Sequence, residues 1–344
     1  MLNRIIRILG ATLCSALLLA GCCKKLHDPA PTPAEAISFD AGSSLLLDDA
    51  KATKAALPAG THFGVFAFLQ PGTAESPGTW NNTRTPDLMF NQDVYYNGYS
   101  YTYTPARYWP DTGNTISFWA YCPYSSSTVF KATNGSSYTR SSTGWPDLCF
   151  SVTDGKKDLL TSNRMQSLSR PANNTVAITF NHRLSKISVN ICKQDPTSRY
   201  TVELKSIRFD GIYLSADLRP DATWRNYSNR SNFTVYADDL NDNTDNIELT
   251  TSDYSFDAVM LIPQSLVYES AKVHVEYSIS YDGILHERTN ACDKLLSEIF
   301  TGDSSSWVKN KQYTLNITIV PDDPIEFTVS WSDWGDDFHY HITS

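Results

Sequence analysis

The chain has 344 residues, of which 37 are acidic and 28 are basic, so its formal net charge is −9 at pH 7. This excess of acidic residues argues against a protein that binds the phosphates of nucleic acids, because such proteins present a basic surface. The length is sufficient for one large domain or two ordinary ones.

The N-terminus has the order of an export signal: basic residues, an apolar run and then small residues. The apolar run 8–20 is shorter than the roughly 20 residues that a membrane-spanning helix needs. It closes on Ala20-Gly21-Cys22, and this ending resembles a bacterial lipobox. The resemblance implies that residues 1–21 are a lipoprotein signal peptide and that Cys22 carries acyl chains that anchor the protein to the outer membrane. The alternative is a plain secretory signal.

Residues 22–36 form a proline-rich segment that has no apolar face to bury. Such a composition predicts a flexible tether rather than a folded element. The tether would hold the folded part of the chain away from the membrane.

Alternation of apolar and polar residues dominates the rest of the chain and predicts strands that bury one face. Clear examples are 273–281, 313–319 and 325–331. Two further runs, 63–68 and 116–121, are apolar on both faces and predict central strands. The fold class predicted from these patterns is all-β.

Because one sandwich rarely holds so many strands, we expect two tandem antiparallel β-sandwich domains. We place them at residues 37–170 and 171–344. A short helix is expected at 293–300, where apolar residues fall on one side of a helical turn. No repeat of about 20–50 residues is apparent, which argues against a propeller or a solenoid.

A set of short motifs runs through the chain after the tether. The motifs are Ile37-Ser38-Phe39, Thr53-Lys54-Ala55, Phe63-Gly64-Val65-Phe66-Ala67, Arg107-Tyr108-Trp109-Pro110, Ile116-Ser117-Phe118-Trp119-Ala120-Tyr121-Cys122-Pro123, Phe180-Asn181-His182-Arg183-Leu184-Ser185-Lys186-Ile187 and Leu261-Ile262-Pro263-Gln264. In this order and spacing the set resembles the fimbrillin family of Bacteroidetes, the subunits of lipoprotein-derived (type V) pili.

The resemblance implies two transthyretin-like β-sandwich domains and a particular route of assembly. Subunits reach the surface as lipoproteins, and a trypsin-like protease cuts after an Arg or Lys near the N-terminus. The excised strand leaves a groove with unpaired backbone, which a terminal strand of a neighbouring subunit fills. The implied partners are other pilus subunits, of the same or a related kind, and a host glycan or protein.

The resemblance places the cut between the strand expected at 37–39 and the first core strand. Lys54 lies in this interval, and we predict cleavage after it, so that the processed chain begins at Ala55. Lys51 is the nearest alternative site. A lysine on a solvated loop is the alternative interpretation of Lys54, because lysines are common on surfaces.

The C-terminal end carries a second strand pattern, in which Phe338, Tyr340 and Ile342 alternate with polar residues. This tail is apolar enough to act as a donor strand in the groove of a partner subunit. It equally fits the last strand of the chain's own sheet.

The chain lacks the G-x-S-x-G and P-loop motifs, and we predict neither enzymatic activity nor a cofactor. Residues 286–290 begin like a zinc-protease helix, but the second histidine is missing. The acidic run 239–245 resembles a calcium loop without its turn glycine and bidentate glutamate. We therefore predict no metal site.

Aromatic residues are concentrated in one stretch, where alternation places Tyr95, Tyr99, Tyr101 and Tyr103 on one strand face. Exposed rings can stack on sugars, but aromatic residues in strands more often pack across the sheet, and we favour packing. The leading hypothesis is thus a structural or adhesive subunit of a bacterial surface fibre. The alternative is a monomeric outer-membrane lipoprotein that binds glycans.

Overall fold

The first sheet is built mainly from the N-terminal half of the chain. The computed structural model of the protein describes residues 36–45, 53–195, 199–238, 247–281, 284–302, 305–321 and 324–334. In spatial order the nine-stranded sheet contains β2 (Thr53–Ala56), β1 (Ser38–Leu45), β11 (Thr175–His182), β9 (Leu160–Ser162), β6 (Thr115–Cys122), β3 (His62–Gln70), β4 (Met89–Tyr96) and β5 (Tyr101–Thr102), with β10 (Met165–Leu168) paired to β6.

Two further sheets come mainly from the C-terminal half. The five-stranded sheet has the order β16 (Tyr254–Ser255), β12 (Ser185–Lys193), β20 (Lys311–Ile319) and β21 (Glu326–Asp333), with β17 (Val259–Leu261) paired to β12. The seven-stranded sheet has the order β19 (Ile284–Leu295), β18 (Lys272–Tyr281), β13 (Tyr200–Leu218), β8 (Asp147–Ser151) and β7 (Phe130–Lys131), with β14 (Trp224–Ala237) and β15 (Ile247–Glu248) paired to β13. The short helix α1 (Leu296–Ile299) follows β19.

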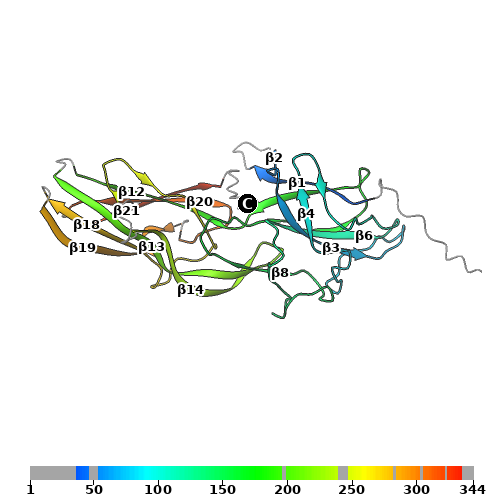
Figure 1. The fold of residues 1–344 in the computed structure, drawn as a ribbon. Coiled ribbons are helices and arrows are strands. Elements are labelled where there is room, and N and C mark those ends of the chain that lie inside the picture. Colours follow the sequence, from blue (N-terminus) through cyan, green and yellow to red (C-terminus); the bar gives the residue numbers. More distant parts are fainter. Residues whose placement is uncertain are drawn as a thin grey trace, which may run out of the picture.

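The five-stranded and seven-stranded sheets enclose a common core, as in a β-sandwich. Alternate residues of β12 and β20 point into it, among them Ile187, Val189 and Leu315. Residues of β13 and β18 such as Phe209 and Val275 meet them from the other sheet. Figure 1 shows this sandwich at one end of the molecule, with β1, β3, β4 and β6 at the other.

The nine-stranded sheet curls so that its two ends meet around a second core. The hydroxyl of Tyr101 in β5 donates a hydrogen bond to the carbonyl of Ala41 in β1, at 2.6 Å. The inner face carries Phe63, Phe118 and Phe180, all fully buried. This curled end therefore has an apolar interior of its own.

The central strands β3 and β6 are buried on both faces. Their inner face lies in the core of the curled sheet, and their outer face packs into the core of the β-sandwich. Phe66 and Trp119 lie on that outer face, with ring centroids 5.9 Å apart. Gly64 in β3 has no room for a side chain, since a Cβ there would lie 2.1 Å from Cε1 of Tyr121. The glycine thus lets an aromatic ring approach the backbone closely.

The two halves of the chain are joined by consecutive strands, because β11 belongs to the nine-stranded sheet and β12 to the five-stranded one. Only Arg183 and Leu184 separate them, and both are buried. Two pairings among the described strands are parallel, β1 with β11 and β12 with β20, and each involves one of these two strands. The remaining pairings of named strands are antiparallel.

The structure confirms the all-β fold class and the strands expected from alternation. The runs 273–281, 313–319 and 325–331 correspond to β18, β20 and β21, and the runs that are apolar on both faces are the central strands β3 and β6. The expected helix is shorter than predicted, because β19 remains paired with β18 as far as Leu295. Within the described residues, no helix is long and apolar enough to cross a membrane.

The domain boundary between residues 170 and 171 stays a prediction. Strands near it cross-pair between the halves: β11, which follows the boundary, joins the first sheet, and β8, which precedes it, joins the seven-stranded sheet.

We expect the Leu315→Ala substitution in β20 to lower the free energy of unfolding by about 2–5 kcal/mol, because it leaves a cavity in the shared core. Thr328→Ala in the neighbouring strand β21 is the control, since this side chain is exposed and its loss should change the free energy by less than about 0.5 kcal/mol. Urea unfolding followed by circular dichroism measures both values. Equal effects of the two substitutions would contradict the assigned burial.

Candidate functional site

The first of the described strands is inserted into the nine-stranded sheet next to its edge. Strand β1 lies between β2, at the edge, and β11. It runs parallel to β11 in a register that extends from Ser38 opposite Thr175 to Ser43 opposite Phe180. Because every other pairing in this sheet is antiparallel among the described strands, β1 is an exception to the pattern around it.

The segment that leads into β1 and the strand itself bury alternate side chains in the curled core. Ile37 is 2% exposed, Phe39 5% and Ala41 2%, whereas Ser38 and Asp40 point to solvent. This alternation follows from the two-residue period of a strand. The segment therefore plugs the interior of the curled sheet with three consecutive inward-facing residues.

Phe39 is the central side chain of this plug. Its ring makes edge-to-face contacts with Phe63, Tyr103 and Phe118, at centroid distances of 6.0, 5.5 and 6.4 Å. These rings come from β3, β6 and the segment after β5, so one residue of the first strand contacts three separate parts of the core. Such aromatic pairs contribute about 0.5–1.5 kcal/mol each beyond the burial of their area.

Two tyrosine hydroxyls donate hydrogen bonds to the backbone of this segment. The Tyr103 hydroxyl donates to the Ile37 carbonyl at 2.8 Å, and the Tyr101 hydroxyl donates to the Ala41 carbonyl at 2.6 Å. The Ile37 amide donates to the Arg107 carbonyl at 2.8 Å. Burial raises the pKa of Tyr101 to about 12, so the hydroxyl remains a donor at any physiological pH.

The predicted cleavage site lies in β2, the edge strand that pairs antiparallel with β1. In β2, Lys54 pairs with Ser44, and Ala55 pairs with Ser43. The Lys54–Ala55 bond thus lies in β2, the edge strand of the sheet. Along the chain, β2 connects β1 to the strands that follow. A cut there would leave β1 attached by non-covalent contacts alone.

The other residues predicted to function in anchoring and assembly lie outside the described residues. They are the lipid-attachment residue Cys22, the alternative cleavage site Lys51, and the donor-strand residues Phe338, Tyr340 and Ile342. Their roles stay predictions.

The tyrosine stretch does not lie on one face, which corrects the expectation from alternation. A turn with Gly98 at φ +97° reverses the chain between β4 and β5 and resets the alternation. As a result Tyr99 is 97% exposed, and Tyr96 rather than Tyr95 stacks on Tyr101, at 4.5 Å. Tyr101 and Tyr103, which contact the β1 segment, pack against the core of the curled sheet, in agreement with the predicted packing role.

His182 has an acidic partner that its sequence neighbourhood does not reveal. Its Nδ1 donates to Asp158 at 2.6 Å, and both side chains are buried. The ring of Trp334 stacks on the imidazole at a centroid distance of 4.0 Å. This arrangement gives His182 a structural role, because it fixes the start of the β11–β12 connection.

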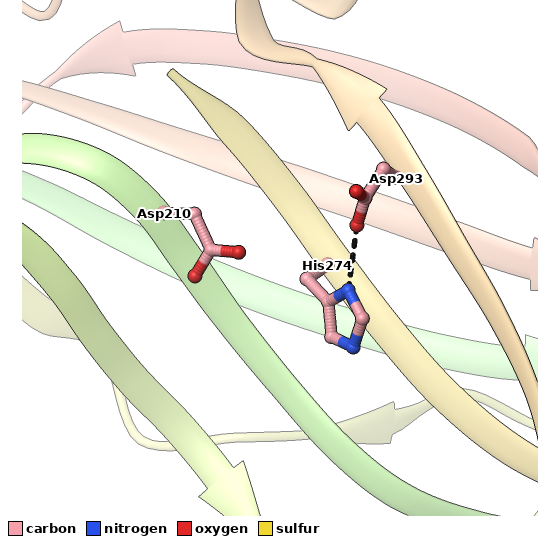
Figure 2. Close-up of side chains that lie close together, drawn as sticks. All are labelled: Asp210, His274 and Asp293. Atoms are coloured by element: carbon pink, nitrogen blue, oxygen red, sulfur yellow. Dashed lines mark hydrogen bonds and ion pairs between the residues drawn. The ribbon is translucent and has the colours of Figure 1, made fainter. Parts of the chain in front are cut away.

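A cluster of possible metal ligands lies on the seven-stranded sheet, where strand pairing brings together residues that are distant in sequence. Asp210 of β13, His274 of β18 and Asp293 of β19 have potential ligand atoms within 4.8 Å of one another. Figure 2 shows His274 directed at Asp293, with the Asp210 carboxylate on the neighbouring strand. The distance from His274 Nδ1 to Asp293 Oδ1 is 2.6 Å.

Both carboxylates of this cluster already have cationic partners. Arg208 Nε donates to Asp210 at 2.8 Å, and Lys272 Nζ lies 3.6 Å from Asp293. The hydrogen bond from His274 holds the pKa of Asp293 below its usual value. A metal ion would have to displace these partners, so we interpret the cluster as a network of ion pairs on a solvated sheet face.

A family model described as fimbrillin-like matches residues 50–334 of the chain. The chain belongs to the fimbrillin-like family. Strand β1 lies before the matched range. The chain is also 26% identical over 240 residues to the fimbrium subunit Fim1C of Phocaeicola vulgatus. That alignment covers 61% of this chain and 62% of the relative, so this fimbrillin-like chain matches less than two thirds of the relative's length.

Two solved structures with the same fold are described as a fimbrial protein and a putative cell adhesion protein. A fimbrial protein from Bacteroides vulgatus superposes on the fimbrillin-like chain with a TM-score of 0.61 at 18% identity, over 87% of this chain and 99% of that one. A putative cell adhesion protein from Bacteroides ovatus gives a TM-score of 0.54 at 13% identity, over 88% and 99%. These similarities establish a common all-β fold.

We expect Tyr101→Phe to lower the free energy of unfolding by about 0.5–1.5 kcal/mol at neutral pH, because the Ala41 carbonyl loses its donor. The folded-state pKa of Tyr101 is raised from 10.0 to about 12, so its contribution is fully present below pH 10 and is lost as the pH rises toward 12. The stability advantage of the wild type should therefore shrink across this range in urea titrations.

The matched control for this titration is Tyr99→Phe, whose hydroxyl belongs to a side chain that is 97% exposed. Its difference from the wild type should stay near zero at every pH. A difference for Tyr101→Phe that is constant from pH 8 to pH 12 would show that this hydroxyl does not clamp β1.

Proposed function

We propose that this fimbrillin-like chain is a structural and adhesive subunit of a cell-surface fibre, exported as a lipoprotein anchored to the outer membrane through Cys22. In this proposal a protease cuts after Lys54, β1 leaves, and the C-terminal strand of another subunit takes its place. The chain thus functions through assembly with other pilus subunits and not as an enzyme. The name of its relative, a fimbrium subunit, supports a location in the fimbrium.

The observation that carries the proposal is the way in which β1 is seated. It precedes the predicted cut, and yet it fills the interior of the curled sheet. Its departure would uncover the rings of Phe63 and Phe118 and leave the facing edge of β11 without hydrogen-bond partners. An apolar groove with an unpaired strand edge is a template for the addition of a strand from another chain.

The energetics favour exchange over simple release. Burial of a large apolar side chain contributes about 1.5–3 kcal/mol, and both Ile37 and Phe39 are buried. A vacated groove would lose this stabilisation together with the ladder to β11, so β1 should remain in place after the cut until an incoming strand displaces it. The proteolytic cut makes the exchange possible by removing the covalent link.

The apolar residues of the C-terminal tail recur with the same period as the buried residues of the segment that the tail would replace. Strand β1 and the residue before it bury positions 37, 39 and 41, and the sequence of the tail places Phe338, Tyr340 and Ile342 at the same period of two. Two large side chains and one β-branched residue could occupy the sites of the side chains that leave. This match supports the tail as the donor strand.

Treatment of the purified chain with a trypsin-like protease should convert monomers into ladders that resist mild denaturation in gel electrophoresis. Lys54→Ala should abolish the ladders, because β1 stays covalently attached, whereas Lys51→Ala should leave them unchanged. Replacement of Phe338, Tyr340 and Ile342 by serine should permit cleavage but prevent ladder growth, since the pockets then remain without apolar occupants.

Mass spectrometry of the native N-terminus provides an independent measurement. Membrane fractions should contain chains that begin at lipidated Cys22, and sheared surface material should contain chains that begin at Ala55. If every chain in the sheared material still begins at Cys22, or if chains that begin at Ala55 remain monomeric, the proposed exchange does not occur.

A further inference from the structure

A long loop between β7 and β8 is fixed to the nine-stranded sheet by two buried aromatic side chains. Tyr138 stacks parallel to Phe90, with an interplanar angle of 4°, and Trp145 stacks on Trp80 at a centroid distance of 4.3 Å. Tyr138 is 6% exposed and Trp145 7%. Tyr138 holds the middle of the loop and Trp145 holds its C-terminal end, so the core beneath the loop restrains its shape.

Hydrogen bonds within the loop complete this restraint. The Tyr138 hydroxyl donates to the carbonyl of Gly144, and the amide of Gly144 donates to the Arg84 carbonyl at 2.9 Å. The Ala132 amide donates to the Ser136 carbonyl at 2.8 Å. A loop that is held in this way presents its outer side chains in a preorganised arrangement, which lowers the entropy that a ligand must overcome.

The loop forms one wall of a cleft of about 620 Å³, a size typical of small-molecule sites. Its contribution is almost entirely short polar side chains, with Trp145 as the aromatic residue of the lining. The opposite wall comes from the β13–β14 turn, which supplies Arg219 and Asp221, and from Arg164 between β9 and β10. The cleft is therefore bounded by segments from both halves of the chain.

The lining of the cleft carries two arginines and two aspartates, and each aspartate has partners of its own. Asp147 in the lining is buried and paired with Arg225 outside it. Asp221 accepts a hydrogen bond from the Thr223 amide at 3.1 Å and lies 3.8 Å from Arg219. Arg164 is exposed. Although burial opposes it, the hydrogen bonds from Thr223 and the positive charges of Arg219 and Arg164 lower the pKa of Asp221, so both arginines lie close enough to act on this carboxylate. The exposed guanidinium of Arg164, with the further donors of Arg219, is available to a ligand.

We propose that this cleft binds a saccharide that carries a carboxylate, such as a sialic acid or a uronic acid. Hydroxyl and amide side chains of the loop match the dense hydrogen-bonding groups of a sugar. A guanidinium can donate two parallel hydrogen bonds to a carboxylate. Arg164 and Arg219 would supply such donors to the carboxylate of the sugar. The proposal deepens the adhesive part of the proposed function, but binding does not depend on strand exchange.

The test uses the purified chain without residues 1–21 on an array of oligosaccharides that end in sialic, glucuronic or galacturonic acid. Each is printed beside its neutral counterpart, for example sialyllactose beside lactose. We expect binding of carboxylated members only, and the affinity is then measured by calorimetry. The double substitution Arg164→Gln and Arg219→Gln should weaken it at least about tenfold, the effect of losing about 1.4 kcal/mol of charge-assisted hydrogen bonding.

Arg208→Gln is the matched control, because it removes one arginine that pairs with Asp210 on the seven-stranded sheet, away from the cleft. It should bind as the wild type does. Equal binding to carboxylated and neutral sugars, binding to none of them, or unchanged affinity of the folded double variant would each overturn the proposal. The Lys54→Ala chain, which lacks the proposed cleavage site, should bind normally, so a failure of strand exchange and a failure of sugar binding are distinguished.

Discussion

The fold of the N-terminal half depends on a strand that comes from the very start of the described chain. Strand β1 closes the gap between β2 and β11, and its inward-facing residues complete a core whose walls are contributed by later strands. Because Phe39 contacts rings from several of these strands, the curled sheet cannot reach its full packing density until the segment is seated. In the proposed exchange, this segment is the element that a strand of similar pattern from another subunit would replace.

The back wall of this groove explains how a strand could leave without collapse of the sheet. Strands β3 and β6 place one face in the groove and the other in the core shared with the C-terminal sandwich. Phe63 and Phe66, three residues apart in β3, belong to different cores for this reason. Contacts with the C-terminal sandwich, which do not involve β1, therefore support β3 and β6. The sheet could open locally at β1 without unfolding of the whole chain.

Much of the fold could be predicted from the sequence, because alternation and doubly apolar runs report directly on burial. The strands at 273–281 and 313–319 and the central strands are examples, and so is the strand that begins near Ile37. The contacts of the site were harder to predict, since they depend on pairing between distant segments. The clamp from Tyr101 to Ala41 arises only when the sheet curls. The pair His274–Asp293 arises from strand register, and the pair His182–Asp158 arises because β11 pairs with β9 just after Asp158. The tyrosine stretch was misplaced because one glycine turn shifts the period of alternation.

The connection between β11 and β12 has a mechanical consequence for a fibre. The strand that borders the groove continues, after two buried residues, into a strand that is paired in parallel with β20 over the register from Lys186 to Lys193. Tension applied to a strand seated on β11 would pass along the covalent backbone into that ladder. There it would act as shear across many hydrogen bonds at once, rather than peeling them apart in succession. In the proposed fibre, force on a donor strand would thus reach the five-stranded sheet through a continuous path of backbone and hydrogen bonds.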